Sequence, residues 1–192
     1  MNIRRSIFFI LIVAIFLFSC QNRSLYREER ILLGTLVEVI SPCKDAPKIV
    51  FEEIERIEEL LSKYKENSEV SQLNRIGRLK VSKDTFYIIE KAKWFWENTE
   101  GAFDITVGPL LDLWGLKSKN FKEPREEEIK DTLKYTGSDK IVLKPQEFIV
   151  EFIISGLKID LGGIAKGYAV DCAVRKLRER NIKSCLINAG GD

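Results

Sequence analysis

The segment "KIDLGGIAKGYAVD", residues Lys158–Asp171, joins an apolar alternation to paired glycines and then to an amphipathic pattern. We expect a strand over 157–160, a turn at Gly162 and Gly163, and a helix over 164–180. A helix N-terminus favours an anion, and glycines let a ligand approach the backbone closely. The spacing Gly-Gly-x-x-x-Gly matches neither the dinucleotide fingerprint nor the Walker pattern. By itself the segment therefore fits a phosphate cradle and tight strand–helix packing equally well.

The patterns around this segment alternate between strands and helices. They predict a strand over 30–41, a helix over 48–61, a loop with one short helical turn over 62–77, a helix over 82–101 capped by Ser82 or Asp84, an ordered loop and short helix over 101–115, a surface helix starting near Pro124, a hairpin over 139–153 and a last strand over 183–192. Such interleaving predicts a mixed α/β (α+β) fold, with mixed sheets and flanking helices.

The first nineteen residues are typical of an export signal rather than of a folded domain. Arg4 and Arg5 precede an unbroken apolar run over 7–18. A membrane-spanning helix needs roughly 20 apolar residues, whereas the core of a secretory signal needs roughly 7–15. Ser19 and Cys20 close the run as "LFSC", which resembles a lipoprotein leader whose cysteine becomes lipidated. An ordinary signal peptide or an uncleaved anchor is the alternative.

These features divide the chain into three parts. We expect a lipoprotein signal peptide over 1–19, a polar tether over 20–30 and the folded domain over 31–192. The protein would then be lipid-anchored through Cys20 to a membrane of the cell envelope, facing the periplasm or the exterior. The folded part is long enough for one sizeable domain.

The composition excludes several classes of protein. Without the two leader arginines, 29 basic residues balance 29 acidic ones, so the sequence lacks the excess of positive charge that is typical of nucleic-acid-binding proteins. The sequence has no histidine, so Ser-His-Asp and Cys-His catalysis and histidine-ligated zinc are excluded. Beyond the leader, Cys43, Cys172 and Cys185 are an odd number without a Cys-x-x-Cys pair, so we expect free thiols and no disulfide framework. Any metal should be a hard cation on oxygen ligands.

Five segments, in order, resemble the ApbE family of lipid-anchored FAD:protein FMN transferases. The resemblance spans about Ile31 to Asp192. The "FDITVGPL…LWG" and "DLGGIAKGYAVD" segments are long and specific, so we do not expect both to match by chance. The five segments are "LLGTLVEV", "LLSKYKENSEVSQLNR", "GAFDITVGPLLDLWG", "KIDLGGIAKGYAVD" and "LINAGGD".

The resemblance implies a reaction, a metal and a set of site residues. Family members bind FAD beside Mg²⁺, cleave its pyrophosphate and attach FMN through a phosphoester to a Thr or Ser of an acceptor protein, releasing AMP. The implied acceptor is a subunit of a periplasmic redox complex. Gly163 matches the residue whose backbone carbonyl ligates the metal. The positions that match FAD contacts are Leu33, Tyr64, Ala102, Phe103, Asp104, Asp160 and Lys166.

The sequence departs from the family pattern at two places. Leu33 stands where the family usually has methionine, which preserves an apolar contact. The sequence ends after "NAGGD", whereas relatives in the family continue to an Asp…Thr motif that supplies the side-chain metal ligands. We therefore expect the N-terminal portion of an ApbE-like domain with its C-terminal part missing. A lipid-anchored FAD-binding or scavenging protein, an FAD pyrophosphatase and an inactive fragment are the alternatives to a transferase.

Overall fold

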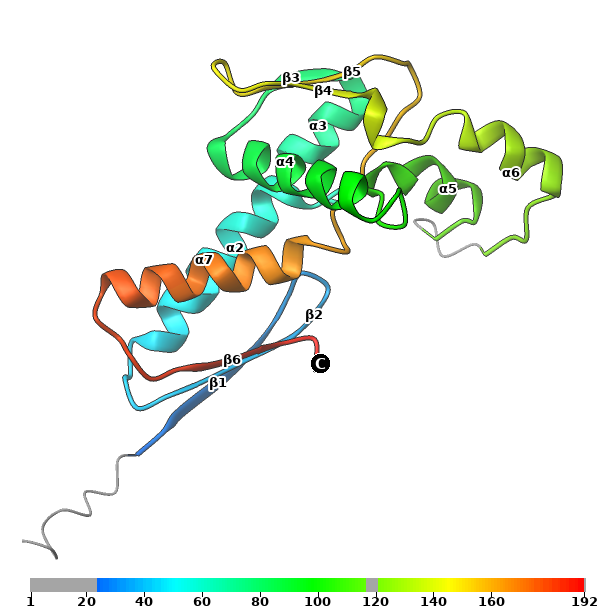
Figure 1. Cartoon of the computed structure of the whole chain (residues 1–192). Helices are drawn as coiled ribbons and strands as arrows, with labels where there is room; N and C mark the ends of the chain where they lie inside the picture. Colours follow the sequence, from blue (N-terminus) through cyan, green and yellow to red (C-terminus); the bar gives the residue numbers. More distant parts are fainter. Residues whose placement is uncertain (1–23, 117–120, 192) are drawn as a thin grey trace, which may run out of the picture.

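The computed structural model describes residues 24–116 and 121–191 (Figure 1). The expected signal peptide and Cys20 lie outside these ranges. No helix within the described residues is long and apolar enough to cross a membrane. With η marking 3₁₀ helices, the elements are β1 Tyr26–Leu32, β2 Thr35–Ser41, α2 Ala46–Leu61, α3 Glu69–Ile76, β3 Arg78–Lys80, α4 Lys83–Asn98, η1 Ile105–Val107, α5 Gly108–Leu113, α6 Glu126–Leu133, η2 Ser138–Lys140, β4 Ile141–Lys144, β5 Ile149–Phe152, α7 Ala165–Glu179 and β6 Leu186–Ala189.

Two small sheets flanked by helices confirm the predicted mixed α/β (α+β) fold, although within the described residues each sheet is antiparallel rather than mixed (Figure 1). The first sheet has the order β1-β2-β6, and the second has the order β3-β5-β4. The central strand β2 alternates, so that Val37 and Val39 are fully buried. In the pairing register they lie opposite Ala189 and Ile187 of β6. The predicted last strand, β6, therefore pairs with β2, which lies within the predicted first strand.

The prediction of one strand over 30–41 is wrong, because the chain reverses there into the hairpin of β1 and β2. Leu33 and Gly34 form its two-residue turn, with φ angles of 54° and 72°. Two-residue hairpin loops favour positive φ at both positions, since that geometry matches the twist of the strands. A leucine at such a position is unusual, so the sequence gives only Gly34 as a turn signal.

The predicted tether over 20–30 is also wrong for its last five residues, because β1 begins at Tyr26. The strand lies at the edge of its sheet and is almost entirely exposed, so its side chains need no apolar alternation. Backbone pairing with β2 forms the strand instead, from Tyr26 opposite Ser41 to Leu32 opposite Thr35. Because most of β1 is polar, the sequence has no apolar alternation there that would predict a strand.

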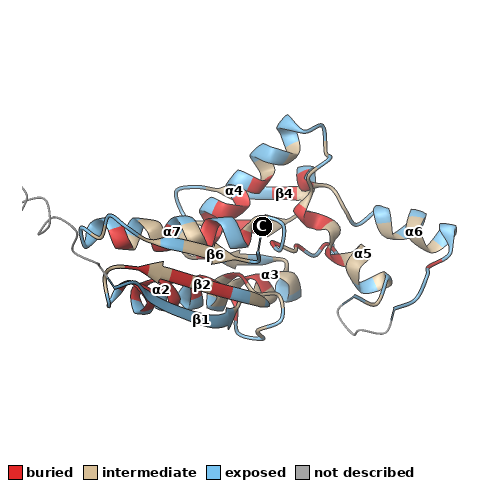
Figure 2. Ribbon diagram, turned by 90° about the horizontal axis from the view of Figure 1, so that it is seen from below, coloured by how far each residue is buried: buried red, intermediate tan, exposed pale blue. Residues whose placement is uncertain are grey.

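Helices α2 and α7 pack against each other and cover the first sheet on one side (Figure 1). The buried face of α2 includes Ile54 and Ile57, as its predicted periodicity requires. On α7, Ala169 and Ala173 are fully buried, and such small residues let two helix backbones approach closely. Figure 2 shows buried residues along β2 and on the faces of both helices. This layer fixes the start of α7 relative to the end of α2.

The segment 62–77, predicted as a loop with one short helical turn, contains a regular helix, α3. Ser68 caps its first turn by accepting a hydrogen bond from the Ser71 N–H at 3.0 Å, and Gly77 ends it with a φ of 74°. The helix has eight residues, of which only Val70 and Leu73 are buried, so its apolar pattern was too short to read. The predicted start of α4 is confirmed, because Ser82 accepts from the Thr85 N–H at 3.2 Å.

The predicted strand over 157–160 does not form. The segment belongs to neither sheet, although Leu157 and Ile159 are buried as the alternation requires. Its backbone is satisfied by other groups, which are described below with the site. The helix that follows is confirmed as α7.

Candidate functional site

The main chain before Asp160 is held by a side chain of α3. The Nδ2 of Asn74 donates to the Ile159 carbonyl at 2.9 Å, and the Ile159 N–H donates to the Asn74 Oδ1 at 2.7 Å. The Asp160 N–H donates to the Ile105 carbonyl at 2.7 Å. One side-chain amide therefore takes the place of a neighbouring strand, because it offers the same donor and acceptor as a peptide group.

Both oxygens of the Asp160 carboxylate have partners. Oδ1 accepts a hydrogen bond from the Gly162 N–H at 2.7 Å, and Oδ2 contacts the Nζ of Lys63 in an ion pair. Each of the paired side chains is 15% exposed. Burial lowers the pKa of Lys63, but the hydrogen bond and the charge of Asp160 outweigh it, so the pKa lies above its ordinary value. Lys63 is therefore charged at neutral pH.

Lys63, which pairs with Asp160, also contacts the ring of Tyr64. Its Nζ lies 5.1 Å from the centroid of the Tyr64 ring, which is within the range of a cation–π contact. The Tyr64 side chain is 67% exposed, so its ring is available for stacking with a ligand. It borders a groove of about 340 Å³ beside the Asp160 segment. The groove is lined by Lys63, Tyr64, Glu66, Ser71, Asn74, Arg75, Gly108, Asp112, Lys158 and Ile159.

Phe103 packs on the glycine turn before α7. A Cβ built on Gly163 would lie 3.2 Å from Cε2 of the Phe103 ring, so ring and backbone are in close contact. The Phe103 ring also meets Phe95 of α4 edge to face, with 5.9 Å between centroids. Gly163 itself is exposed, and so is Ala102. The glycine therefore permits a contact with Phe103 that a larger residue would push apart.

Asp104 has a local folding role. Its Oδ1 accepts hydrogen bonds from the Thr106 N–H at 2.8 Å, the Thr106 hydroxyl at 2.7 Å and the Ser138 hydroxyl at 2.8 Å. It thereby caps η1 and ties it to η2. The nucleotide contact predicted for Asp104 stays a prediction, and a substitution there also removes this cap.

Lys166 and Leu33 lie at the same end of the α2–α7 layer. The Lys166 side chain is exposed, and its Nζ is 3.5 Å from a Cβ built on Gly190, just after β6. That Cβ would also lie 3.8 Å from the Thr35 hydroxyl at the start of β2. The Leu33 N–H donates to the Glu58 Oε1 of α2 at 3.1 Å. In Figure 1 the β1–β2 turn lies close to the N-terminal end of α7.

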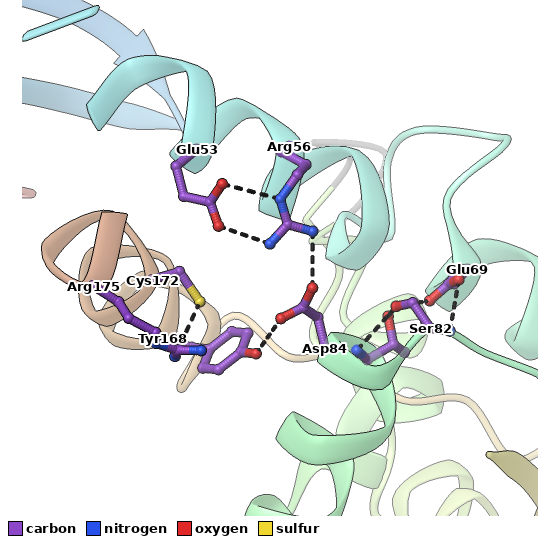
Figure 3. A network of polar contacts seen from close by, with 9 residues as sticks. Glu53, Arg56, Glu69, Ser82, Asp84, Tyr168, Cys172 and Arg175 are labelled. Atoms are coloured by element: carbon purple, nitrogen blue, oxygen red, sulfur yellow. Dashed lines mark hydrogen bonds and ion pairs between the residues drawn. The ribbon is translucent and has the colours of Figure 1, made fainter. Parts of the chain in front are cut away.

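A polar network holds α7 against α2 and α4 (Figure 3). Arg56 donates to both oxygens of Glu53, at 3.1 and 2.7 Å, and to the Asp84 Oδ2 at 2.8 Å. The Tyr168 hydroxyl donates to the Asp84 Oδ1 at 2.5 Å. Burial raises the pKa of Asp84, but hydrogen bonds from Tyr168 and Arg56 outweigh it and hold the pKa below its ordinary value. Burial, and then the bond to Asp84, raise the pKa of Tyr168.

The described cysteines, Cys43, Cys172 and Cys185, are free thiols, as the sequence predicts. Cys172 is buried on α7, and burial raises the pKa of its thiol. Cys185 lies directly before β6 and is half-buried. A buried thiol with a raised pKa is a poor nucleophile, so Cys172 is a packing residue.

Gly163 is the residue matched to a metal ligand, and within the described ranges the other ligands of a Mg²⁺ site do not join it. No three or more Cys, Asp or Glu side chains gather there in a group that could hold a metal ion. The nearby carboxylates have other partners, since Asp160 pairs with Lys63 and Asp104 caps η1. Mg²⁺ prefers near-octahedral oxygen ligands, usually with one or two carboxylates. The Gly163 carbonyl alone does not meet that need.

Lys63 and Asn74 are the two site residues that the sequence did not single out. Both lie in the stretch read as a loop, where no periodicity marks a face. The signal that could have found Lys63 is its position beside Tyr64, the residue matched to a flavin contact. Nothing in the sequence indicates that either residue reaches the segment of Ile159 and Asp160.

Comparison with known proteins agrees with the resemblance seen in the sequence. A family model described as "ApbE family" matches residues 33–192. The chain is 31% identical over 176 residues to a FAD:protein FMN transferase of Klebsiella pneumoniae, covering 89% of this chain and 56% of the relative. A second FAD:protein FMN transferase, from Haemophilus influenzae, is 31% identical over 140 residues, covering 69% of this chain and 40% of the relative.

Solved structures show the same fold. The ApbE protein of Thermotoga maritima superposes with a TM-score of 0.80 at 34% identity, covering 88% of this chain and 57% of that one. The flavin transferase ApbE of Vibrio cholerae gives 0.79 at 26% identity, covering 88% and 58%. The chain thus spans about half the length of the relatives that it matches.

Proposed function

Because this chain belongs to the ApbE family, we propose that the protein is a flavin transferase that cleaves FAD and attaches FMN to a Thr or Ser of an acceptor protein. One observation carries the proposal beyond family membership. The segments matched to FAD contacts, although distant in sequence, meet around the start of α7: Lys63 joins Tyr64 to Asp160, and Phe103 packs on Gly163. Such convergence supports one binding site rather than scattered structural residues.

The start of α7 suits the diphosphate of FAD. The residue before the helix, Ile164, provides no side-chain cap. The Ala165 N–H donates to the Leu161 carbonyl at 2.8 Å, which leaves the first-turn N–H groups of Lys166 and Gly167 for an anion. Lys166 adds an exposed ammonium group in that turn. In this proposal the exposed ring of Tyr64 stacks on the nucleotide, and Asp160 accepts hydrogen bonds from it.

The reaction is a phosphoryl transfer. The acceptor hydroxyl attacks the phosphorus of the FMN moiety and loses its proton, and the bond from that phosphorus to the bridging oxygen breaks. AMP leaves with that oxygen, and a phosphoester links FMN to the acceptor. Such a reaction depends on positioning and charge stabilisation more than on covalent chemistry by the protein, so the lack of histidine in the sequence is no obstacle.

The proposal extends to a metal, a location and an acceptor. Bound Mg²⁺, with the Gly163 carbonyl as one ligand, would neutralise charge on the pyrophosphate. Lipidation at Cys20 would hold the protein at a membrane, facing the periplasm or the exterior. The acceptor would be a subunit of a periplasmic redox complex. These three points rest on the family resemblance and on the leader.

The test is transfer in a purified system. The full chain in mild detergent is incubated with FAD, Mg²⁺ and a candidate acceptor, and a Lys166→Ala variant is run in parallel. We expect flavin fluorescence on the acceptor in a denaturing gel, equimolar AMP by chromatography, and a lower rate for the variant. Bound FAD without AMP would instead indicate a flavin carrier. AMP with free FMN would indicate an FAD pyrophosphatase, and neither binding nor AMP would refute the proposal.

A further inference from the structure

A carboxylate at a site for a diphosphate raises an electrostatic problem. Asp160 lies three residues before the exposed Gly163, at the turn that leads into α7. An unpaired carboxylate there would repel the anionic ligand that the start of α7 and Lys166 favour. Its hydrogen-bonding capacity is useful only if its charge is balanced.

Lys63 supplies that balance within the described residues. Its Nζ contacts the Asp160 Oδ2, with both side chains largely withdrawn from solvent. The neighbouring Lys158 is engaged elsewhere, since its Nζ lies 2.7 Å from the Asp112 Oδ2. Lys166 extends toward Gly190. In the part of the chain that the structure describes, Lys63 is thus the cation found in contact with Asp160.

The pair is held in place before any ligand binds. The Asn74 amide fixes the backbone of Ile159, and the Gly162 N–H fixes the other oxygen of Asp160. The ammonium of Lys63 also lies within cation–π range of the Tyr64 ring. The raised pKa keeps Lys63 charged through the neutral range. A pre-oriented pair loses less freedom on binding than two mobile side chains would.

We propose that Lys63 is a positioning residue that neutralises and orients the Asp160 carboxylate, which lets the site combine a carboxylate acceptor with an anionic flavin nucleotide. Lys63 also borders the groove beside Tyr64, but its role in this proposal is exerted through Asp160 rather than through a bond of its own to the ligand. This inference rests on the proposed function, because it takes FAD to be the ligand.

A double-mutant cycle on FAD affinity tests this role. The dissociation constant of FAD is measured by flavin fluorescence for wild type, Lys63→Met, Asp160→Asn and the double variant, all as the full chain in mild detergent. We expect Lys63→Met to weaken FAD binding by about tenfold or more, which is the scale of one charge-assisted interaction. In the Asp160→Asn background the same change should cost less than about twofold, since no carboxylate is left to neutralise.

Two further variants separate this role from a structural one. Lys63→Arg keeps the charge and should bind FAD within about threefold of wild type. Lys134→Met is the matched control, because Lys134 is an exposed lysine just after α6 that pairs with Asp131 at 2.6 Å rather than with Asp160. Thermal melts without ligand identify folded variants, and Lys63→Gln replaces Lys63→Met if the latter does not melt cooperatively.

The outcomes are distinct. An equal loss in both backgrounds would show that Lys63 contacts the ligand directly, and no loss in either would show that the pair is irrelevant to binding. Either result overturns the inference while leaving the proposed function intact. Failure of the wild type to bind FAD would overturn both.

Discussion

Replacing Asn74 with alanine should destabilise the protein far more than an average polar substitution. The side chain makes two hydrogen bonds to Ile159, whose own side chain is fully buried. Asn74→Ala removes both bonds and leaves a backbone N–H and a C=O without these partners. Segment 157–160 belongs to neither sheet, so no neighbouring strand is in place to satisfy them.

The magnitude follows from the cost of unsatisfied buried groups. Each costs about 1–3 kcal/mol, so the pair should lower the free energy of unfolding by about 2–6 kcal/mol. For a chain of this size, 1 kcal/mol corresponds to about 2–4 °C in melting temperature, which gives a decrease of roughly 4–24 °C. FAD affinity should fall as well, since Asp160 follows directly after Ile159.

Urea unfolding and thermal melts followed by circular dichroism measure this effect. Gln72→Ala is the matched control, since Gln72 lies on the same helix and its Nε2 donates to the Asn67 carbonyl at 2.8 Å on the surface. We expect that control to change stability by less than about 0.5 kcal/mol. An Asn74→Ala variant as stable as Gln72→Ala would refute the view that this amide stands in for a strand.

Three other perturbations have defined outcomes. Burial raises the pKa of Asp84, but hydrogen bonds from Tyr168 and Arg56 outweigh burial and hold the pKa below its ordinary value. The Asp84 carboxylate therefore stabilises the fold above its ordinary pKa, and this stabilisation is lost as pH falls through the lower pKa of the folded state. Urea titrations from about pH 5 to about pH 2 should thus show a smaller loss of stability for Asp84→Asn than for wild type. Gly108→Ala should lower the urea midpoint, because the added Cβ would lie 2.6 Å from the Lys158 carbonyl oxygen. Gly167→Ala in α7 is the control and should leave the midpoint unchanged, because its Cβ would meet nothing within 4 Å. Equal midpoints for the two variants would contradict this packing. Removing Mg²⁺ with EDTA should stop AMP release, followed by chromatography, and excess Mg²⁺ should restore it; unchanged release would contradict the proposed metal.

The elements that local signals specify were predictable from the sequence. Helices α2 and α7 carry clear apolar stripes, and the hydroxyl of Ser82 caps α4 as its position indicates. The hairpin of β4 and β5 follows from two apolar runs around Pro145 and Gln146, although the turn between the strands extends to Phe148. In each case the information lies within a few residues of the element that it determines.

Features that depend on distant partners were not predictable. The alternation over 157–160 indicates a strand, but its backbone partners are Asn74 and Ile105. Lys63 and Asp160 lie far apart in sequence, and nothing local to either residue announces their pair. The residue types of the site could be proposed from the family resemblance, whereas the contacts that hold them require the fold.

The central claim is that the groups around the start of α7 bind FAD, and equilibrium titration of FAD tests it most directly. The full chain in mild detergent is titrated by flavin fluorescence as wild type, Asp160→Ala and Asp171→Ala, the last being an exposed acid further along α7. The account predicts binding by wild type, similar affinity for Asp171→Ala, and a loss of about 1.5–3 kcal/mol for Asp160→Ala. Equal affinity for all three proteins would contradict it.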